Sequence, residues 1–412
     1  MTSLPAQDRG SPDLLALSEA VEAHRRYLTG RSGGQRLRLN YVDLANCDLE
    51  GADLREADLA GVSFAGAKLS RANLSRAILF GADLAGADLR RANLKRCDLR
   101  GASLRGANLA LAHMAGCDLR EGRIALQDKL NGYSVIRHVQ RAGELAYANL
   151  AGANLTGAQL DGTNATASDF TDAILAGAHL TGARLMRAVL DGADLSGADL
   201  GGADLTGASL RRAVLAGASL EHARLDDADL TQALREPPAL VRIGDRTLET
   251  VLAEYEAYCD SDGREGVVTA TPAVDFRALQ SLEGRRLTAL VAPRGIFFGL
   301  DLRCVQLQGA DLSGGDFRRA DLRGADLRGA KLVDADLGRA DLRCAQLGPL
   351  LIAPGRQVRT DFTGASLRGA DLRGAAAMRA RFLECDIGDA RLDGCDLRQA
   401  ELAADQPRAP TS

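Results

Sequence analysis

A large apolar residue, usually leucine, recurs at every fifth position over most of this chain, and alanine usually stands two residues before it. Residues 52–56 read ADLRE, for example, and residues 82–86 read ADLAG. A period of five matches neither the 3.6-residue period of a helix nor the two-residue period of a strand. Fixed-period repetition is typical of solenoids, in which each repeat buries its apolar residues only against its neighbours. Such a chain has few positions left for catalytic chemistry.

The repeats form three runs, which we describe by the large apolar residue at the centre of each repeat. Centres extend from Leu39 to Leu119, from Leu150 to Leu230 and from Leu302 to Leu402. The first gap is one residue longer than six repeats, and the second is two residues longer than fourteen repeats. These shifts predict interruptions at residues 124–147 and 235–299. The repeat pattern of the third run is also irregular between residues 349 and 357, but it resumes in the same register at residue 362.

The sequence therefore predicts seven segments. They are an N-terminal tail and helical cap (1–36), the first run (37–123), an interruption (124–147), the second run (148–234), an interruption with a helical cap (235–299), the third run (300–403) and a polar, disordered tail (404–412).

The pattern A-(D/N)-L-x-x, which covers about two-thirds of the chain, resembles the pentapeptide-repeat proteins. The resemblance implies an all-β solenoid, a right-handed quadrilateral β-helix in which four repeats make one square coil. It also implies that the centre and the alanine two residues before it point inward. Leucine suits this core, since each buried leucine contributes roughly 1.5–3 kcal/mol. Glycine is frequent at the fifth position, as in Gly81 and Gly86, and we expect a tight corner there that leaves no room for bulky side chains.

Two stretches outside the runs have helical spacing. Residues 11–13 (Ser-Pro-Asp) are a favourable helix start, followed by a stripe at residues 14–28 that includes His24. We expect this helix to cap the first coil, with His24 packed rather than acting as a ligand. A second stripe at residues 248–258 predicts a new cap before the third run, so the chain would form two rods in tandem. The interruption at 124–147 could be strand-like or helical.

Cysteine positions favour packing over disulfides or metal binding. Five cysteines replace the inward alanine: Cys47, Cys97, Cys117, Cys385 and Cys395. Cys304 and Cys344 are separated by eight repeats, or two coils, which places both on one outward face. The chain has no C-x-x-C motif and no nearby pair of histidines. We therefore predict reduced thiols, no metal site and no cofactor.

The sequence contains no recognisable catalytic motif. It has no P-loop and no H-E-x-x-H motif, and no histidine is followed by a second histidine at the spacing of one coil. We expect a non-enzymatic protein without a small-molecule substrate. The N-terminus begins without an apolar segment, and no apolar run in the chain is long enough to span a membrane. We therefore also expect a cytoplasmic protein that does not associate with membranes.

Charge is unevenly distributed along the chain. The net charge is +2 over residues 37–123, −6 over 148–233 and zero over 300–402. Two functions remain open: a rigid scaffold for an unknown protein partner, or a binder of DNA gyrase or topoisomerase. The second follows from resemblance to the quinolone-resistance branch of the family, whose members mimic duplex DNA. Its candidate partner-binding residues are Asp191, Asp194, Asp199 and Asp204. Because mimicry needs a uniformly negative face and the other runs are neutral or basic, we favour the scaffold.

Three further features bear on partners. A basic cluster extends from Arg90 to Arg105, but it lacks the interleaved aromatic residues that stack on bases, which argues against nucleic acid as a partner. Residues one coil apart should stack, which predicts a solvated column of alternating charges: Asp301, Asp321, Asp341 and Asp361 beside Arg303, Arg323 and Arg343. The C-terminal tail provides no apolar cap, so the last coil either frays or pairs with a second subunit as a homodimer.

Overall fold

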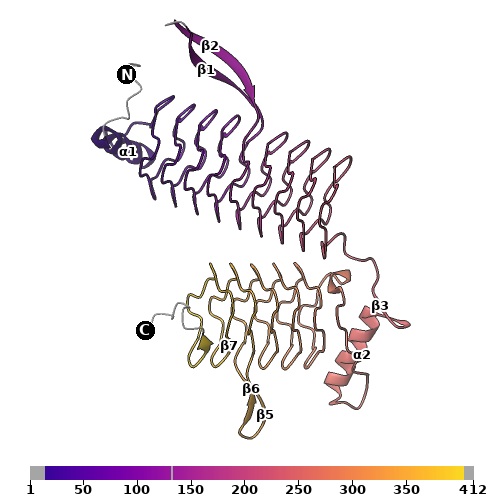
Figure 1. Ribbon diagram of the computed structural model, residues 1–412. Coiled ribbons are helices and arrows are strands. Elements are labelled where there is room, and N and C mark those ends of the chain that lie inside the picture. The colour runs from indigo at the N-terminus through magenta and orange to yellow at the C-terminus, as the bar shows by residue number, and fades with distance from the viewer. Residues whose placement is uncertain (1–13, 131–132, 403–412) are drawn as a thin grey trace. The chain divides into compact units, whose positions relative to one another are not determined.

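The computed structural model describes residues 14–130 and 133–402. The chain divides into two compact units, Met1–Glu236 and Pro237–Ser412 (Figure 1). Each unit has its own hydrophobic core inside a stack of coils.

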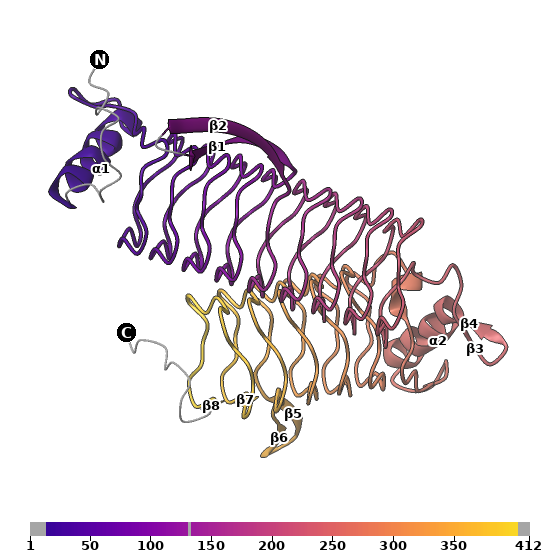
Figure 2. The ribbon, with the colours of Figure 1, turned by 45° about the horizontal axis from the view of Figure 1, so that its top comes forward.

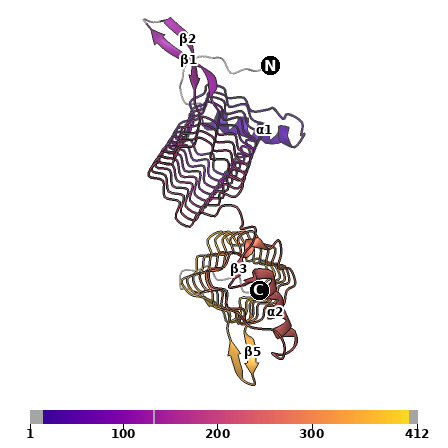
Figure 3. The ribbon, with the colours of Figure 1, turned by 90° about the vertical axis from the view of Figure 1, so that its right-hand side faces the viewer.

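Every coil has four sides, and each side contributes one residue to a ladder that runs along the solenoid. Parallel bridges join equivalent residues of successive coils, such as Asn73 with Asn93, and Asn93 with His113. The Leu74 N–H donates to the Asn93 carbonyl at 2.7 Å, and the Asn93 N–H donates to the Ala72 carbonyl at 2.9 Å. Each coil thus satisfies the backbone of its neighbour, and the predicted four-sided β-helix is confirmed (Figure 3).

The centres form apolar columns inside each unit. Leu54, Leu74, Leu94 and Met114 follow one another on one side, and none is more than 1% exposed. The alanine two residues before each centre is buried as well, as Ala72 shows. Large and small side chains therefore alternate around the tube, as the sequence predicts.

The fifth position of each repeat lies at a corner where the backbone φ is positive. Gly86 has a φ of 64°, and Arg71 and Arg91 adopt φ values of 59° and 58° at equivalent corners. A Cβ added to Gly86 would meet nothing within 4 Å. The expectation that these corners exclude bulky side chains is therefore wrong. Glycine is frequent there because a left-handed backbone costs other residues about 1–2 kcal/mol.

Helix α1 (Leu14–Leu28) closes the N-terminal end of unit 1 (Figure 2). Leu17 joins the core, and His24 is completely buried. The His24 ring accepts a hydrogen bond from the Leu37 N–H at Nδ1 (3.0 Å), and its Nε2 lies 2.9 Å from the Arg55 carbonyl oxygen. This pairing suits the neutral ring, and burial lowers the His24 pKa. His24 is a packed cap residue, as predicted; the expected helix start at residues 11–13 lies outside the described residues.

The first interruption is a β-hairpin that leaves the solenoid continuous. Strands β1 (Gly122–Leu130) and β2 (Tyr133–Arg141) pair antiparallel and project from the coils. Ser103 bridges directly to Glu144, whereas an uninterrupted coil would pair it with Arg123. The insertion therefore lengthens this coil by four whole repeats and one residue, which explains the one-residue shift in the sequence register. The coils resume at Glu144, earlier than the predicted residue 148, and Leu145 is fully buried.

Unit 2 begins with its own cap. Strands β3 (Arg242–Ile243) and β4 (Arg246–Thr247) pair, and α2 (Leu248–Asp260) starts at Thr247, whose side chain accepts from the Thr250 N–H. The helix buries most of the predicted stripe, but Tyr258 is 40% exposed. Arg285 occupies a position that is usually an inward alanine, in the first coil of unit 2. Its side chain forms ion pairs with Glu249 and Glu256 of this helix.

The coils of unit 2 start well before the predicted residue 300. Bridges begin with Asp275 to Ile296, next to a 3₁₀ turn, η1 (Phe276–Ala278). Phe276, Phe297 and Phe317 stack in the core with ring centroids 4.3 and 4.5 Å apart. The interruption predicted at 235–299 is therefore too long. Residues 285, 290 and 295 replace the usual inward alanine, which hides these repeats in the sequence.

A second hairpin interrupts unit 2, formed by β5 (Leu350–Ala353) and β6 (Arg356–Val358). Lys331 bridges to Asp361 rather than to Leu351, so the insertion is two repeats long. Strand β7 (Arg381–Phe382) pairs in parallel with β8 (Glu401–Leu402), which belongs to the next and last coil. The apolar centres of this coil are only partly buried, so the described part of unit 2 ends on an open core.

Candidate interaction surfaces

The aspartate or asparagine before each centre supports the backbone. Its Oδ1 accepts a hydrogen bond from the N–H two residues later: Asp83 accepts from Ala85 at 3.0 Å, and Asn149 from Ala151 at 2.9 Å. Contacts of this kind stabilise turns. The regular aspartates of the repeat therefore serve the corners first and do not by themselves mark a binding site.

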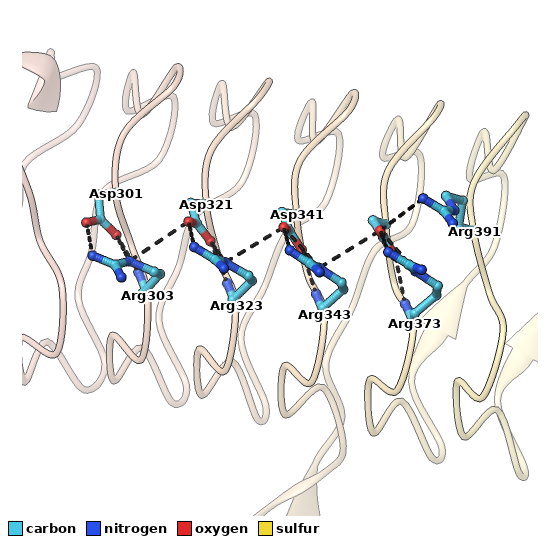
Figure 4. Close-up of polar contacts among 9 residues, drawn as sticks. Asp301, Arg303, Asp321, Arg323, Asp341, Arg343, Arg373 and Arg391 are labelled. Atoms are coloured by element: carbon cyan, nitrogen blue, oxygen red, sulfur yellow. Dashed lines mark hydrogen bonds and ion pairs between the residues drawn. The ribbon is translucent and has the colours of Figure 1, made fainter.

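One side of unit 2 carries a continuous ladder of ion pairs (Figure 4). Within a coil, Arg323 forms a fork with Asp321, with Nε 2.8 Å from Oδ1 and Nη2 2.6 Å from Oδ2. Between coils, the same Nε lies 3.8 Å from the Asp341 carboxylate. The pattern repeats along the ladder, whose members are Asp301, Arg303, Asp321, Arg323, Asp341, Arg343, Asp371, Arg373 and Arg391.

The ladder favours the ionised form of three of its carboxylates. Hydrogen bonds from the arginine of the same coil lower the pKa of Asp301, Asp321 and Asp371. These groups remain partly exposed, so each pair contributes little stability by itself. Positive and negative groups alternate along this side, which gives it a fixed charge pattern with little net charge.

The sequence predicts Asp361 as the fourth aspartate of this column, and that position is wrong. Asp361 bridges to Lys331 and Arg381 on another side of the coil. Asp371 stacks on Asp341 instead. The β5–β6 hairpin adds two repeats, which equal two sides of a coil, so it moves the ladder without disturbing the register of five.

The four aspartates predicted as one surface in the second run lie on four different sides. Asp194, Asp199 and Asp204 belong to three separate bridge columns. Asp191 lies on the remaining side, with its carboxylate 2.8 Å from the Arg211 guanidinium. Consecutive repeats occupy consecutive sides of a square coil, so residues one repeat apart cannot form one face. The prediction that these four aspartates form a single acidic surface is therefore wrong.

All four of these aspartates also have local hydrogen-bond partners. Asp194 is only 4% exposed and accepts from the Ser196 N–H at 3.0 Å. Asp204 accepts from the Thr206 hydroxyl and lies 3.3 Å from Arg224; these contacts lower its pKa. Within residues 144–234 of the structure, no bridge column is acidic throughout. The basic cluster between Arg90 and Arg105 is also divided, because Arg100 and Arg105 lie on other sides of the coil than Lys95 and Arg96.

All eight cysteines are free. Cys97 and Cys117 are buried in the core, as predicted, and burial raises the pKa of Cys97 to about 12 and that of Cys117 well above its ordinary value. Cys304 and Cys344 are exposed. Among the residues that the structure describes, no group of three or more histidine, cysteine or acidic side chains is placed to hold a metal ion.

No helix in the described ranges is long and apolar enough to cross a membrane. The open end of unit 2 forms a small apolar hollow, lined by Leu367, Leu372, Phe382, Ile387, Leu392, Leu397 and Leu402.

Several solved structures are similar to this chain. HetL, a pentapeptide repeat protein involved in heterocyst differentiation regulation from the cyanobacterium Nostoc sp. strain PCC 7120, is 22% identical over 92% of each chain, with a TM-score of 0.18. Rfr23 from the cyanobacterium Cyanothece 51142 is 24% identical over 31% of this chain and 91% of its own, with a TM-score of 0.24. QnrB1, a plasmid-mediated fluoroquinolone resistance protein, is 21% identical over 49% of this chain and 86% of its own, also with a TM-score of 0.24. At these TM-scores none of the three supports an argument about function.

No curated protein matches the chain. The family model for pentapeptide repeats, in contrast, matches residues 38–120, 144–232, 301–348 and 359–402, which is more than half of the chain. These ranges fall within the stacked coils and skip both hairpins, the cap of unit 2 and the first coil of unit 2. The chain therefore belongs to the pentapeptide-repeat family, whose fold is the right-handed quadrilateral β-helix.

Proposed function

We propose that this protein is a non-enzymatic scaffold that binds a protein partner through the outward side chains of its coils. One observation carries the proposal: the core is filled by leucine and alanine, while the backbone ladder holds outward residues from distant repeats in fixed columns. A surface ordered in advance loses little entropy on binding. Pentapeptide-repeat proteins are generally structural or interaction proteins. The free cysteines support a reducing, cytoplasmic setting.

Affinity capture from the cells that make this protein tests the scaffold. The intact chain is immobilised, and the captured proteins are identified by mass spectrometry. Chain unfolded by heat and immobilised in the same way is the control. A protein retained by the folded chain alone supports the proposal, and capture of the same proteins by both preparations contradicts it.

Binding of DNA gyrase or topoisomerase is a second candidate, supported by the acidic excess of residues 148–233. The acidic residues are divided among the four sides of the coil, which weakens the argument for gyrase binding. One side, formed by residues 159–162 and their equivalents in the next three coils, holds Asp161, Asp199 and Glu221 and no arginine or lysine. D161N/D199N/E221Q is therefore a sharper test than four consecutive aspartates. Gyrase supercoiling is measured with the wild type and this variant, with and without a quinolone. A lack of effect at micromolar protein removes this candidate.

The apolar hollow at the end of unit 2 supports a homodimer through the open last coil. Leu392 and Leu397 are partly buried there. L397D should then shift a concentration-dependent dimer to monomer in sedimentation equilibrium. A wild type that is monomeric at every concentration contradicts pairing of this kind.

A further inference from the structure

One side of unit 1 collects positive charges that the linear sequence keeps apart. The bridge from Asn73 to Asn93 places residues 71–76 directly beside residues 91–96 in the next coil. Arg71 and Arg91 have φ values of 59° and 58° at one corner of this side, and Arg76 and Arg96 have φ values of 59° and 56° at the other. Lys95 lies between the corners. We call this group the basic side: Arg71, Arg76, Arg91, Lys95 and Arg96.

Few carboxylates offset the charge of the basic side. Among the described residues, Arg71, Lys95 and Arg96 make no ion pair, and Arg76 has one long contact, 3.7 Å to Glu56. Arg91 has an interaction of its own, so the excess charge rests on the other four residues. The nearest aspartates on the two neighbouring sides are held by their own arginines. Asp88 is 2.6 Å from Arg90, and Asp98 is 2.8 Å from Arg100. This side therefore keeps an excess of positive charge.

Between the two corners the side is polar and uncharged apart from Lys95. The Asn93 side-chain amide donates to the Asn73 oxygen at 3.1 Å, and the Ser75 hydroxyl donates to the same oxygen at 2.9 Å. His113 follows in the next coil, and burial together with Lys95 lowers its pKa, so it is neutral at pH 7. Two pairs of arginines thus flank a flat, hydrogen-bonding strip.

We propose that the basic side binds an acidic segment of a partner protein, with carboxylates held by the corner arginines. This inference rests on the proposed scaffold and states the chemistry of its partner. Guanidinium groups bind carboxylates through paired, charge-assisted hydrogen bonds. Nucleic acid fits less well: residues 71–76 and 91–96 include no aromatic side chain for stacking. Two coils also rise by only about 5 Å, too short a span for the phosphate contacts of a duplex binder.

Fluorescence anisotropy with the full chain tests this inference, using a fluorescein-labelled poly-glutamate peptide as the probe and a DNA duplex of equal net charge as the alternative. The test variant is R71Q/K95Q/R96Q. The control, R184Q/R187Q/R294Q, removes the same charge from exposed arginines without ion pairs elsewhere in the described chain. Circular dichroism melting confirms that both variants fold, because all six positions are exposed.

We expect the peptide to bind the wild type and the control equally, and the test variant about tenfold or more weakly. Binding should also weaken with added salt. Equal loss in both variants would show an effect of net charge alone and overturn the inference. Tighter binding of the duplex, lost only in R71Q/K95Q/R96Q, would overturn it in favour of nucleic acid.

Affinity capture separates this inference from the scaffold itself. If R71Q/K95Q/R96Q retains the partner that the wild type captures, the acidic-segment inference fails while the scaffold stands. If the wild type captures no partner, the scaffold fails.

Discussion

Each position of the repeat has its own structural role, and the regular aspartate supports the backbone. Asp83 looks like part of an acidic surface, yet its Oδ1 accepts the Ala85 N–H and supports a corner. Leu74 fills the core, whereas Ser75 next to it faces outward. A binding surface must therefore be sought among residues that the coil does not need.

Substitutions of Leu74 and Ser75 test this difference between core and outward positions directly. Leu74→Ala removes a fully buried side chain, which should lower the free energy of unfolding by about 2–5 kcal/mol. Ser75→Ala should change it by less than about 0.5 kcal/mol. Chemical denaturation of both variants measures the difference, and equal stabilities would contradict the coil assignment.

The corners allow a test of backbone strain without crowding. Gly86 has a positive φ and open space around it. Gly86→Asn should cost less than Gly86→Val, because asparagine tolerates the left-handed region and a β-branched residue does not. A difference of about 1 kcal/mol in thermal denaturation is expected. If both substitutions cost the same, space rather than φ limits this position.

The two hairpin insertions, β1–β2 and β5–β6, decide which side chains meet along the solenoid. The sequence predicts most of the coils, both caps and the positions of the interruptions, because leucine and helical periodicity are local signals. It misses the first coil of unit 2, whose repeats lack the inward alanine. It does not predict that Asp371 rather than Asp361 joins the ladder, since a hairpin of two repeats leaves the register of five unchanged. It also groups Asp191 to Asp204 and Arg90 to Arg105 by proximity in the chain, although neighbours on one side of the solenoid are a whole coil apart in sequence.

The ladder predicts how unit 2 responds to acid. Its arginines lower the pKa of Asp321 in the folded state. The stabilisation is therefore present above the unfolded pKa of about 3.9 and is lost as the pH falls through the lower folded value. Asp321→Asn keeps an oxygen for the Arg323 N–H but removes the charge. We expect the variant to lose less stability than the wild type between pH 5 and pH 2, measured by urea denaturation; identical profiles would exclude a contribution from this pair.

At the scale of the whole molecule, two separate cores predict two unfolding transitions. Leu74 and Leu342 are fully buried, one in each unit. In calorimetry, Leu74→Ala should lower the temperature of one transition and Leu342→Ala that of the other. A single transition that both substitutions shift equally would show that the units unfold together.

The coils of unit 1 stack without a break, so that residues far apart in sequence share one side. Ser63 and Arg184 lie in one bridge column, five coil steps apart across the β1–β2 hairpin. Spin labels at both positions, in a background that lacks the exposed Cys304 and Cys344, should give one narrow distance distribution centred near roughly 24 Å. A broad distribution, or a mean far above this value, would contradict continuous stacking and the columns that follow from it.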